Sequence, residues 1–225
     1  NQITGHSPVK YTDLTPLAYV GSEPVALAVR ADSPYADLKA FMGQLAKDPG
    51  SLSISVGSTR GAVNDLTMAL LAKAAGIPAK SLKILVFRGG SESVTNLLCG
   101  HIDAMVQAVN NAIPNYRAGK MRILCLSTPQ RAPGLSDVPT CREAGYDAVM
   151  EGWTIFAGPK GMTPAQIAYW EALFRKSVAH KDWKDYLAAN SWDPGYMDAQ
   201  QTLAYLGKQY ERDKALLTEL GMAKE

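Results

Sequence analysis

The sequence predicts an α/β fold in which a parallel or mixed sheet is covered by helices on both faces. Between residues 52 and 127, short apolar runs of strand length alternate with longer runs whose apolar residues recur at helical spacing. Glycine-containing turns separate the two kinds of run. The chain has 225 residues, of which 47% are hydrophobic and 20% charged, so it can form one large α/β domain or two small ones.

Charge and composition exclude several classes of protein. A net charge of +2, without a basic run interleaved with aromatic residues, argues against a nucleic-acid partner. No apolar run approaches the length needed to cross a bilayer. The opening residues Asn1-Gln2-Ile3 show no signal-peptide pattern, although a processed or trimmed chain would look the same.

The three cysteines are expected to be free and structural. Cys99, Cys125 and Cys141 lie in dissimilar contexts without CxxC spacing, and one disulfide would leave an odd thiol. Cys125 lies within an apolar run, where a buried thiol acts as a small hydrophobic side chain.

The first part of the chain contains two apolar runs and a helix. Residues 14–20 and 25–29 are interpreted as two strands or as one long crossing strand. Ser33-Pro34 is expected to start a helix, because proline is favoured in a first turn. The apolar stripe of this helix consists of Leu38, Phe41, Met42 and Leu45.

The middle of the chain alternates regularly between strands and helices. The predicted strands are residues 52–56, 84–87, 104–109 and 122–127. Helices are predicted after residue 62, from 91 to 99, from 112 to 118, and as a short turn of helix over 140–144.

Beyond one strand at residues 153–157, the remainder of the chain is predicted to be almost wholly helical. Thr163-Pro164 caps one helix and Trp183 lies in a second. Asp198 with Gln201 resembles a capping box that opens a third helix, extending to about residue 220. This tail has too few strands for an α/β core of its own.

The turn after the first middle strand is a candidate anion site. The hydroxyls of Ser58 and Thr59, with the backbone N–H groups of Arg60, Gly61 and Ala62, could hold a carboxylate or phosphate, and Arg60 would add charge. The alternative is an ordinary βα turn with Arg60 in solvent.

Two more turns are expected at the same edge of the sheet. Arg88-Gly89-Gly90-Ser91 repeats the design after the next strand, and Val109-Asn110 ends the strand after that. Each has an ordinary structural interpretation, including helix capping by an asparagine. Trp153 is interpreted as a packing residue or as the wall of a cleft or hinge.

The sequence predicts no catalytic residue, metal site or cofactor. His6, His101 and His180 are scattered, and neither paired carboxylates nor a G-x-S-x-G nucleophile motif is present. A sheet edge rich in anion donors and poor in general acids and bases indicates binding without turnover.

Several motifs in order resemble the TctC family, also called Bug receptors, the extracytoplasmic solute-binding proteins of tripartite tricarboxylate transporters. Residues 58–66 resemble the family's S-x-P-G-G-T-D-H-L segment, and residues 86–90 resemble V-P-F-K-G-G with Arg88 for lysine. Further matches are residues 71–76 to L-A-K-A-A-G, 97–103 to L-L-G-G-H-V-D, 118–124 to A-G-K-L-R-V-L, and 137–147 to D-V-P-T-x-x-E-x-G-Y-D.

The resemblance implies a two-lobed, type II periplasmic binding protein (Venus-flytrap) fold with mixed sheets, closing on a small carboxylate. Residues 28–151 would form the second lobe and carry the ligand-binding turns. Residues 1–27, with a crossing strand, and residues 152–225 would belong to the first lobe. Nothing in this sequence corresponds to the family's N-terminal segment with its own glycine-rich loop, and an incomplete first lobe would favour self-association.

The candidate turn departs from the family pattern. It carries Arg60 for proline, Ala62 for glycine, Val63 for threonine and Asp65 for histidine. A gained carboxylate beside an anion site weakens any assignment of citrate, while Arg60 and Arg88 are expected to keep the site cationic.

The function predicted from the sequence is a periplasmic or membrane-tethered receptor for a di-, tri- or aromatic carboxylate. It would deliver this solute to the membrane subunits of a tripartite tricarboxylate transporter. One alternative is the effector-sensing domain of a transcriptional regulator. Another is an α/β enzyme acting on a phosphorylated substrate.

Overall fold

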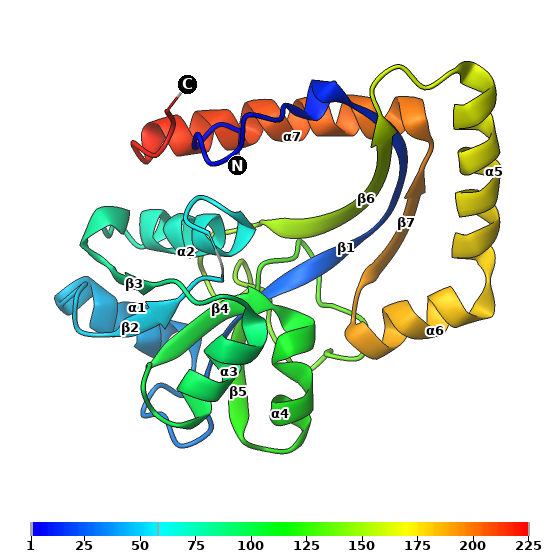
Figure 1. The fold of residues 1–225 in the computed structure, drawn as a ribbon. Helices are drawn as coiled ribbons and strands as arrows, with labels where there is room; N and C mark the ends of the chain where they lie inside the picture. Colours follow the sequence, from blue (N-terminus) through cyan, green and yellow to red (C-terminus); the bar gives the residue numbers. More distant parts are fainter. Residues whose placement is uncertain (1, 58, 225) are drawn as a thin grey trace. The chain divides into compact units, whose positions relative to one another are not determined.

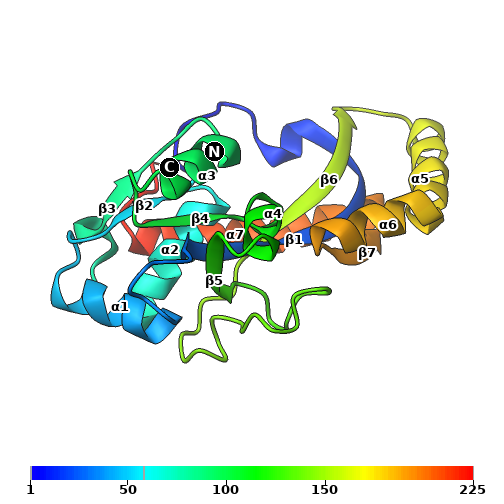
Figure 2. The same ribbon diagram turned by 90° about the horizontal axis from the view of Figure 1, so that it is seen from below.

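The computed structural model describes residues 2–57 and 59–224, and the chain forms two compact units (Figure 1, Figure 2). Unit 1 consists of Asn1–Ser22 and Trp153–Glu225, and unit 2 of Glu23–Gly152. Strand β1 (Leu14–Arg30) contributes its first part to unit 1 and its second part to unit 2. The two apolar runs near the N-terminus therefore form one crossing strand of 17 residues.

Unit 2 is built on a mixed sheet with the strand order β3-β2-β4-β1-β5. Strand β2 (Ser53–Ser55) pairs in parallel with β3 (Lys83–Leu85) and with β4 (Ala104–Ala108). Strand β1 pairs antiparallel with β4 and with β5 (Met121–Leu126). The predicted sheet is confirmed, and the antiparallel pairs make it mixed.

Helices cover both faces of this sheet because alternate side chains of each strand point to opposite faces. Leu27 of β1 joins one buried cluster with Phe41 and Met68, which belong to α1 (Leu38–Lys47) and α2 (Val63–Ala74). Ala28, the next residue of β1, joins a second cluster with Leu97 and Ile113. These two residues belong to α3 (Gly90–Leu98) and α4 (Ile113–Arg117).

Two short 3-10 helices complete unit 2: η2 (Ala79–Ser81) and η3 (Val109–Asn111).

Two predicted elements of unit 2 were wrong in detail. The first helix begins at Leu38 rather than at Ser33-Pro34, because the Asp37 carboxylate accepts a hydrogen bond from the Ala40 amide and caps the helix there. Residues 140–144 form a hydrogen-bonded turn instead of a helix. Thr140 forms a β-bridge with Leu126, so a helix cannot begin there. The residues that follow form a single turn, which is closed by a hydrogen bond of 3.1 Å from the Ala144 amide to the Thr140 carbonyl.

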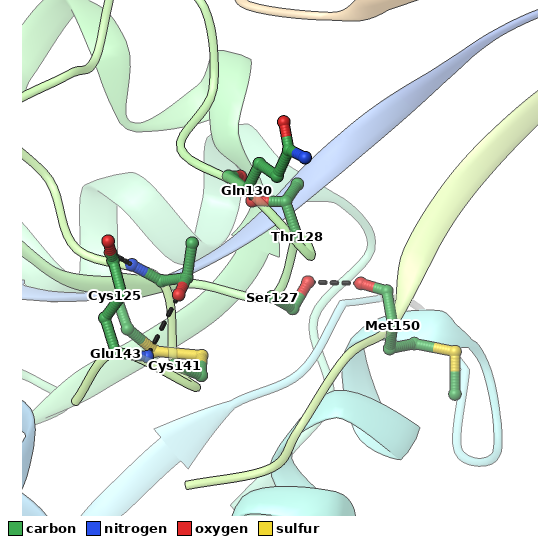
Figure 3. Close-up of a disulfide and its surroundings, with 8 residues drawn as sticks. Cys125, Ser127, Thr128, Gln130, Cys141, Glu143 and Met150 are labelled. Carbon is green, nitrogen blue, oxygen red and sulfur yellow. Dashed lines mark hydrogen bonds between the residues drawn. A yellow bond between two sulfur atoms is a disulfide. The ribbon is translucent and has the colours of Figure 1, made fainter. Parts of the chain in front are cut away.

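The expectation of three free cysteines was also wrong. Cys125 near the end of β5 and Cys141 form a disulfide, with a Cα–Cα distance of 5.0 Å (Figure 3). Cys99 is free and exposed. The same loop is held by the Ser127 hydroxyl, which donates to the Met150 carbonyl, and by Thr140, whose amide donates to Glu143 at 2.8 Å. Burial of Cys125 was predicted correctly, because it lies in the first of the two clusters.

Unit 1 contains the first part of β1 paired on its two sides with β6 (Glu151–Pro159) and β7 (Asp193–Met197). Its helices are η1 (Tyr11–Asp13), α5 (Pro164–Ala179), α6 (Lys181–Asn190) and α7 (Ala199–Glu219). The N-terminal segment runs beside α7 (Figure 1), since Tyr11 contacts Tyr210 with ring centroids 5.4 Å apart. The predicted cap of α5 at Thr163 and the predicted capping box of α7 are both present, and the α5 cap is itself a capping box with Gln166.

The prediction that the tail is helical after residue 157 missed β7. Pro194 and Gly195 are residues that disfavour strands, yet Gly21 and Ser22 of β1 pair with Pro194 and Asp193. Helix α5 differs from expectation in another way, because all 16 of its residues are described and none is buried. Within the described ranges, the helices are too short or too polar to qualify as membrane spans.

Candidate functional site

The candidate turns meet at one edge of the unit 2 sheet. Ser55 of β2 pairs with Leu85 of β3 and with Met105 of β4, so the three parallel strands lie side by side and run towards the same edge of the sheet. The alignment continues into the turns, because the Val56 amide donates to the Leu85 carbonyl and the Phe87 amide to the Gly57 carbonyl, each at 3.2 Å. The carboxyl edge of parallel strands is where ligands of α/β proteins bind.

The first turn leads from β2 into α2. Gly57 and Gly61 have φ values of +90° and +76°, which favour glycine at both positions. The N-cap residue Ala62 has no side-chain acceptor, so the first amides of α2 depend on other partners. Ser58 lies outside the described residues. The Thr59 carbonyl accepts a hydrogen bond from the Ala62 amide at 3.4 Å.

The second turn leads from β3 into α3, whose N-cap is Gly89. The Glu92 carboxylate accepts a hydrogen bond from the Arg88 amide at 2.8 Å. Gly90 lies directly against the Asn111 side chain, because a Cβ atom added at Gly90 would overlap it. Ser91 is exposed in the first turn of the helix.

The two arginines differ in their surroundings. The Arg60 guanidinium donates to the Asp65 carboxylate at 2.9 Å, and Asp65 is only 3% exposed. Arg88 is exposed, and among the described residues its guanidinium has no ion-pair partner. The expectation that both arginines keep the site cationic is therefore wrong for Arg60, because Asp65 neutralises it.

A buried polar network joins the two turns beneath the sheet edge. Gln107 of β4 donates to the Ser93 hydroxyl at 2.8 Å and accepts from the Asn64 amide group at 3.2 Å. These residues link α3, β4 and α2, and Gln107 is 3% exposed. The sequence analysis did not single them out; the polar Gln107 within an otherwise apolar strand was the available signal.

The third candidate segment forms η3. Val109 is buried in the second cluster, so its side chain is a core residue, and its carbonyl accepts from the Ala112 amide at 2.9 Å. Asn110 is partly buried, and its side-chain oxygen Oδ1 accepts a hydrogen bond from the Asn111 side-chain amide at 3.0 Å. The side-chain amide of Asn110 remains available as a donor by its chemistry.

Trp153 belongs to unit 1, whereas the other candidate residues belong to unit 2. It lines a pocket of about 400 Å³ together with Tyr11, Leu14 and, from α7, Leu206 and Tyr210. Trp153 is therefore a lining residue of an aromatic pocket within its own unit.

Chemically, the unit 2 edge presents helix-start amides, the Arg88 guanidinium, which has no ion-pair partner within the described residues, and an asparagine amide, all of which can donate hydrogen bonds to an anion. Throughout residues 2–57 and 59–224, no group of three or more His, Cys, Asp or Glu side chains is arranged to hold a metal ion.

Comparison with known proteins places this arrangement in a family. A family model described as "Tripartite tricarboxylate transporter family receptor", TctC, matches residues 6–222. The chain belongs to the TctC family. The resemblance seen in the short motifs is thereby confirmed.

Two curated relatives match most of this chain and are longer than it. A UPF0065 protein from Cupriavidus necator is 28% identical over 96% of this chain and 64% of its own length. Protein BugT from Bordetella pertussis is 22% identical over 93% of this chain and 63% of its own length. The chain thus spans somewhat less than two thirds of these relatives.

Solved TctC structures show that the fold is that of two-lobed periplasmic binding proteins, as predicted. The periplasmic binding protein BugD matches with a TM-score of 0.85 and 21% identity, over 96% of this chain and 72% of its own. MatC from Rhodopseudomonas palustris, solved with bound malate, has a TM-score of 0.80 and 22% identity, over 97% and 74%. An R. palustris protein solved with adipate has a TM-score of 0.85 and 21% identity, over 97% and 72%.

Proposed function

We propose that this TctC protein is a periplasmic receptor that binds a small organic carboxylate and delivers it to a tripartite tricarboxylate transporter. The observation that carries the proposal is the meeting of two helix starts, α2 and α3, at one sheet edge beside Arg88, which forms no ion pair with any residue that the structure describes. Amide donors at a helix start and a guanidinium are the groups that bind carboxylates in proteins. Malate and adipate, which occupy two structures of similar fold, are both carboxylates.

The groups proposed to meet the solute come from three turns. They are the turn of residues 59–62, in which Asp65 already holds the Gly61 amide and the Arg60 guanidinium, the segment Arg88 to Ser91 with its guanidinium, and the side chain of Asn110. Ser58 and Trp153 remain proposed members, Ser58 through its place in the first turn and Trp153 as an aromatic side chain of unit 1. Unit 1 and unit 2 are proposed to correspond to the first and second lobes.

The disulfide agrees with the proposed location. Disulfides form and persist in oxidising compartments such as the bacterial periplasm and are rare in the cytosol. The bond between Cys125 and Cys141 joins two buried side chains, so it forms part of the folded core of unit 2.

Isothermal titration calorimetry against a panel of di-, tri- and aromatic carboxylates tests the proposal. At least one carboxylate is expected to bind, and Arg88→Ala is expected to weaken it about tenfold or more, as for loss of a charged hydrogen-bond donor. Arg142→Ala, which removes an exposed arginine paired with Asp147, is the matched control for lost charge. The proposal fails if no carboxylate binds. The site assignment fails if Arg60→Ala and Arg88→Ala both leave the affinity unchanged.

A further inference from the structure

Helices α2 and α3 begin with the same hydrogen-bonding arrangement. The third residue of each helix is acidic, and its carboxylate reaches back to the backbone amide that precedes the N-cap residue. Asp65 accepts from the Gly61 amide at 2.7 Å, and Glu92 accepts from the Arg88 amide at 2.8 Å. Each carboxylate therefore takes a donor that an anionic ligand would otherwise use.

The two acidic residues differ in burial and in partners. Asp65 is 3% exposed and also accepts from the Arg60 guanidinium, so its charge is fixed within the turn. Glu92 is exposed, and Arg88 beside it has no ion-pair partner among the described residues. An exposed glutamate can rotate into solvent, whereas the buried, doubly bonded Asp65 cannot leave without breaking both contacts.

We propose that Asp65 determines the specificity of this site: it is a built-in carboxylate that occupies the anion position at the start of α2. A solute carboxylate then binds at the start of α3 beside Arg88, and the part of the solute facing the α2 turn is uncharged or a hydrogen-bond donor. This inference rests on the proposed function and narrows the solute to one that brings a single carboxylate to unit 2.

The physical reason is that a second carboxylate near α2 would meet a fixed like charge. Asp65 also takes the Gly61 amide and neutralises Arg60, so the donor and the cation of that turn are already used. Like charges in close contact disfavour one another's ionised forms. The neighbouring Asn64 side-chain oxygen is buried and finds no hydrogen-bond partner within the described residues, so this turn already holds one unmet acceptor beside the Asp65 carboxylate.

Asp65 could also stabilise α2 without any effect on ligand choice, because an acidic side chain in the first turn favours a helix. The test must therefore read selectivity as well as stability. Calorimetry compares succinate with its monoamide and adipate with its monoamide, in which one carboxylate becomes a neutral amide of similar size. The ratio of the two dissociation constants in each pair reports the penalty for the second charge.

The variants are Asp65→Asn, which keeps an acceptor for the Gly61 amide while removing the charge, and Asp65→His, which restores the residue of the family motif. The wild type is expected to bind each monoamide at least as tightly as the dicarboxylate. Both variants are expected to shift the ratio at least tenfold towards the dicarboxylate. Asp147→Asn, an exposed carboxylate in a different ion pair, makes the same change in net charge and should shift the ratio less than twofold.

The remaining outcomes are decisive. A shift below threefold in every Asp65 variant that folds, with carboxylate binding retained, overturns the role of Asp65 and leaves the proposed function standing. A change in melting temperature without a change in the ratio has the same meaning. If neither the wild type nor any folded variant binds a carboxylate, the proposed function fails together with this inference.

Discussion

Cys125 and Cys141 are joined by a disulfide that ties the end of β5 to the chain beyond the loop of residues 128–139. Both cysteines are buried, and the loop between them carries further hydrogen bonds to Met150 and Glu143 (Figure 3). The two cysteines are 16 residues apart in the sequence, and the bond between them reduces the number of conformations that the unfolded chain can adopt in this segment.

Replacement of both cysteines, as Cys125→Ser with Cys141→Ser, is expected to lower the free energy of unfolding of unit 2 by about 3 kcal/mol, the entropic value for a loop of this size. Urea denaturation followed by circular dichroism measures it, and added reductant should lower the wild-type midpoint to a similar extent. Cys99→Ser, at the free exposed cysteine, is the control and should leave the midpoint unchanged. Equal midpoints with and without reductant would contradict the prediction.

The close approach of Gly90 to Asn111 predicts that a Cβ at Gly90 displaces the end of the Asn111 side chain, which is held by hydrogen bonds to Ala108 and Asn110. Gly90→Ala would force the Asn111 side chain to move and is expected to destabilise the protein by about 1–3 kcal/mol, the usual cost of overpacking, and to weaken carboxylate binding.

Gly89→Ala is the matched control for stability, because a Cβ there has no atom within 4 Å and its φ of 175° suits any residue. Thermal unfolding of both variants measures the difference. Adding Asn111→Ala to Gly90→Ala should recover most of the lost stability; failure to recover it would show that another contact is responsible.

The bridge formed by Gln107 predicts a cost for leaving its buried partners unsatisfied. Gln107→Leu removes the acceptor for Asn64 and the donor for Ser93 and is expected to lower the unfolding free energy by about 1–3 kcal/mol. A double-mutant cycle with Ser93→Ala measures the coupling between Gln107 and Ser93. Gln44→Ala, which removes an exposed hydrogen bond to Ser51, is the control and should change stability by less than about 0.5 kcal/mol. Additive effects of Gln107→Leu and Ser93→Ala would rule out the coupling.

Burial raises the pKa of Glu23, whose side chain packs on the Gly152 backbone. Since the pKa is higher in the folded protein than in the unfolded chain, folding favours the protonated form. Ionisation of Glu23 therefore costs stability as the pH rises from the ordinary value of 4.5 through the folded-state pKa, and the cost is complete above that pKa.

Glu23→Gln is expected to stabilise the protein at pH 7, with the gain disappearing as the pH falls below 4.5. Urea denaturation at a series of pH values measures this. Glu143→Gln should have the opposite sign, because hydrogen bonds from the Thr140 amide and from Arg131 hold the pKa of Glu143 below its usual range. A gain for Glu23→Gln that does not depend on pH would exclude its titration as the cause.

Helix α5 and strand β6 of unit 1 present an aromatic surface. Phe156 and Phe174 stack with ring centroids 4.4 Å apart, while Trp170 and Leu173 remain 38% and 42% exposed. An exposed apolar patch favours association, so the 225-residue chain is expected to self-associate with increasing concentration.

Sedimentation velocity measures this association, and Trp170→Lys combined with Leu173→Lys should abolish it. Lys176→Gln, at an exposed position on the same helix, is the control and should leave it unchanged. A chain that stays monomeric at every concentration would refute the prediction.

Much of the fold follows from local pattern. The apolar stripe of α1, the cap at Thr163 that starts α5, the capping box of α7, and the alternation that builds the unit 2 sheet were all predicted from residue spacing. Each depends on contacts between residues close in sequence, such as the hydrogen bonds between Asp198 and Gln201. Strand β7 was missed because Pro194 and Gly195 have no local preference for a strand, and the distant pairing with β1 outweighs that.

The sequence by itself determined that two glycine-rich turns begin helices at one edge of a sheet, because turn residues and strand–helix alternation act over a few positions. Only the tertiary structure decided which charged side chains of these turns are paired and which contacts fix the turns in place. The Arg60–Asp65 pair, the Gln107 bridge and the Cys125–Cys141 bond depend on distances of a few ångströms between side chains, which residue spacing alone does not define. Sequence therefore located the candidate site, and side-chain packing decided which of its charges remain available to a solute.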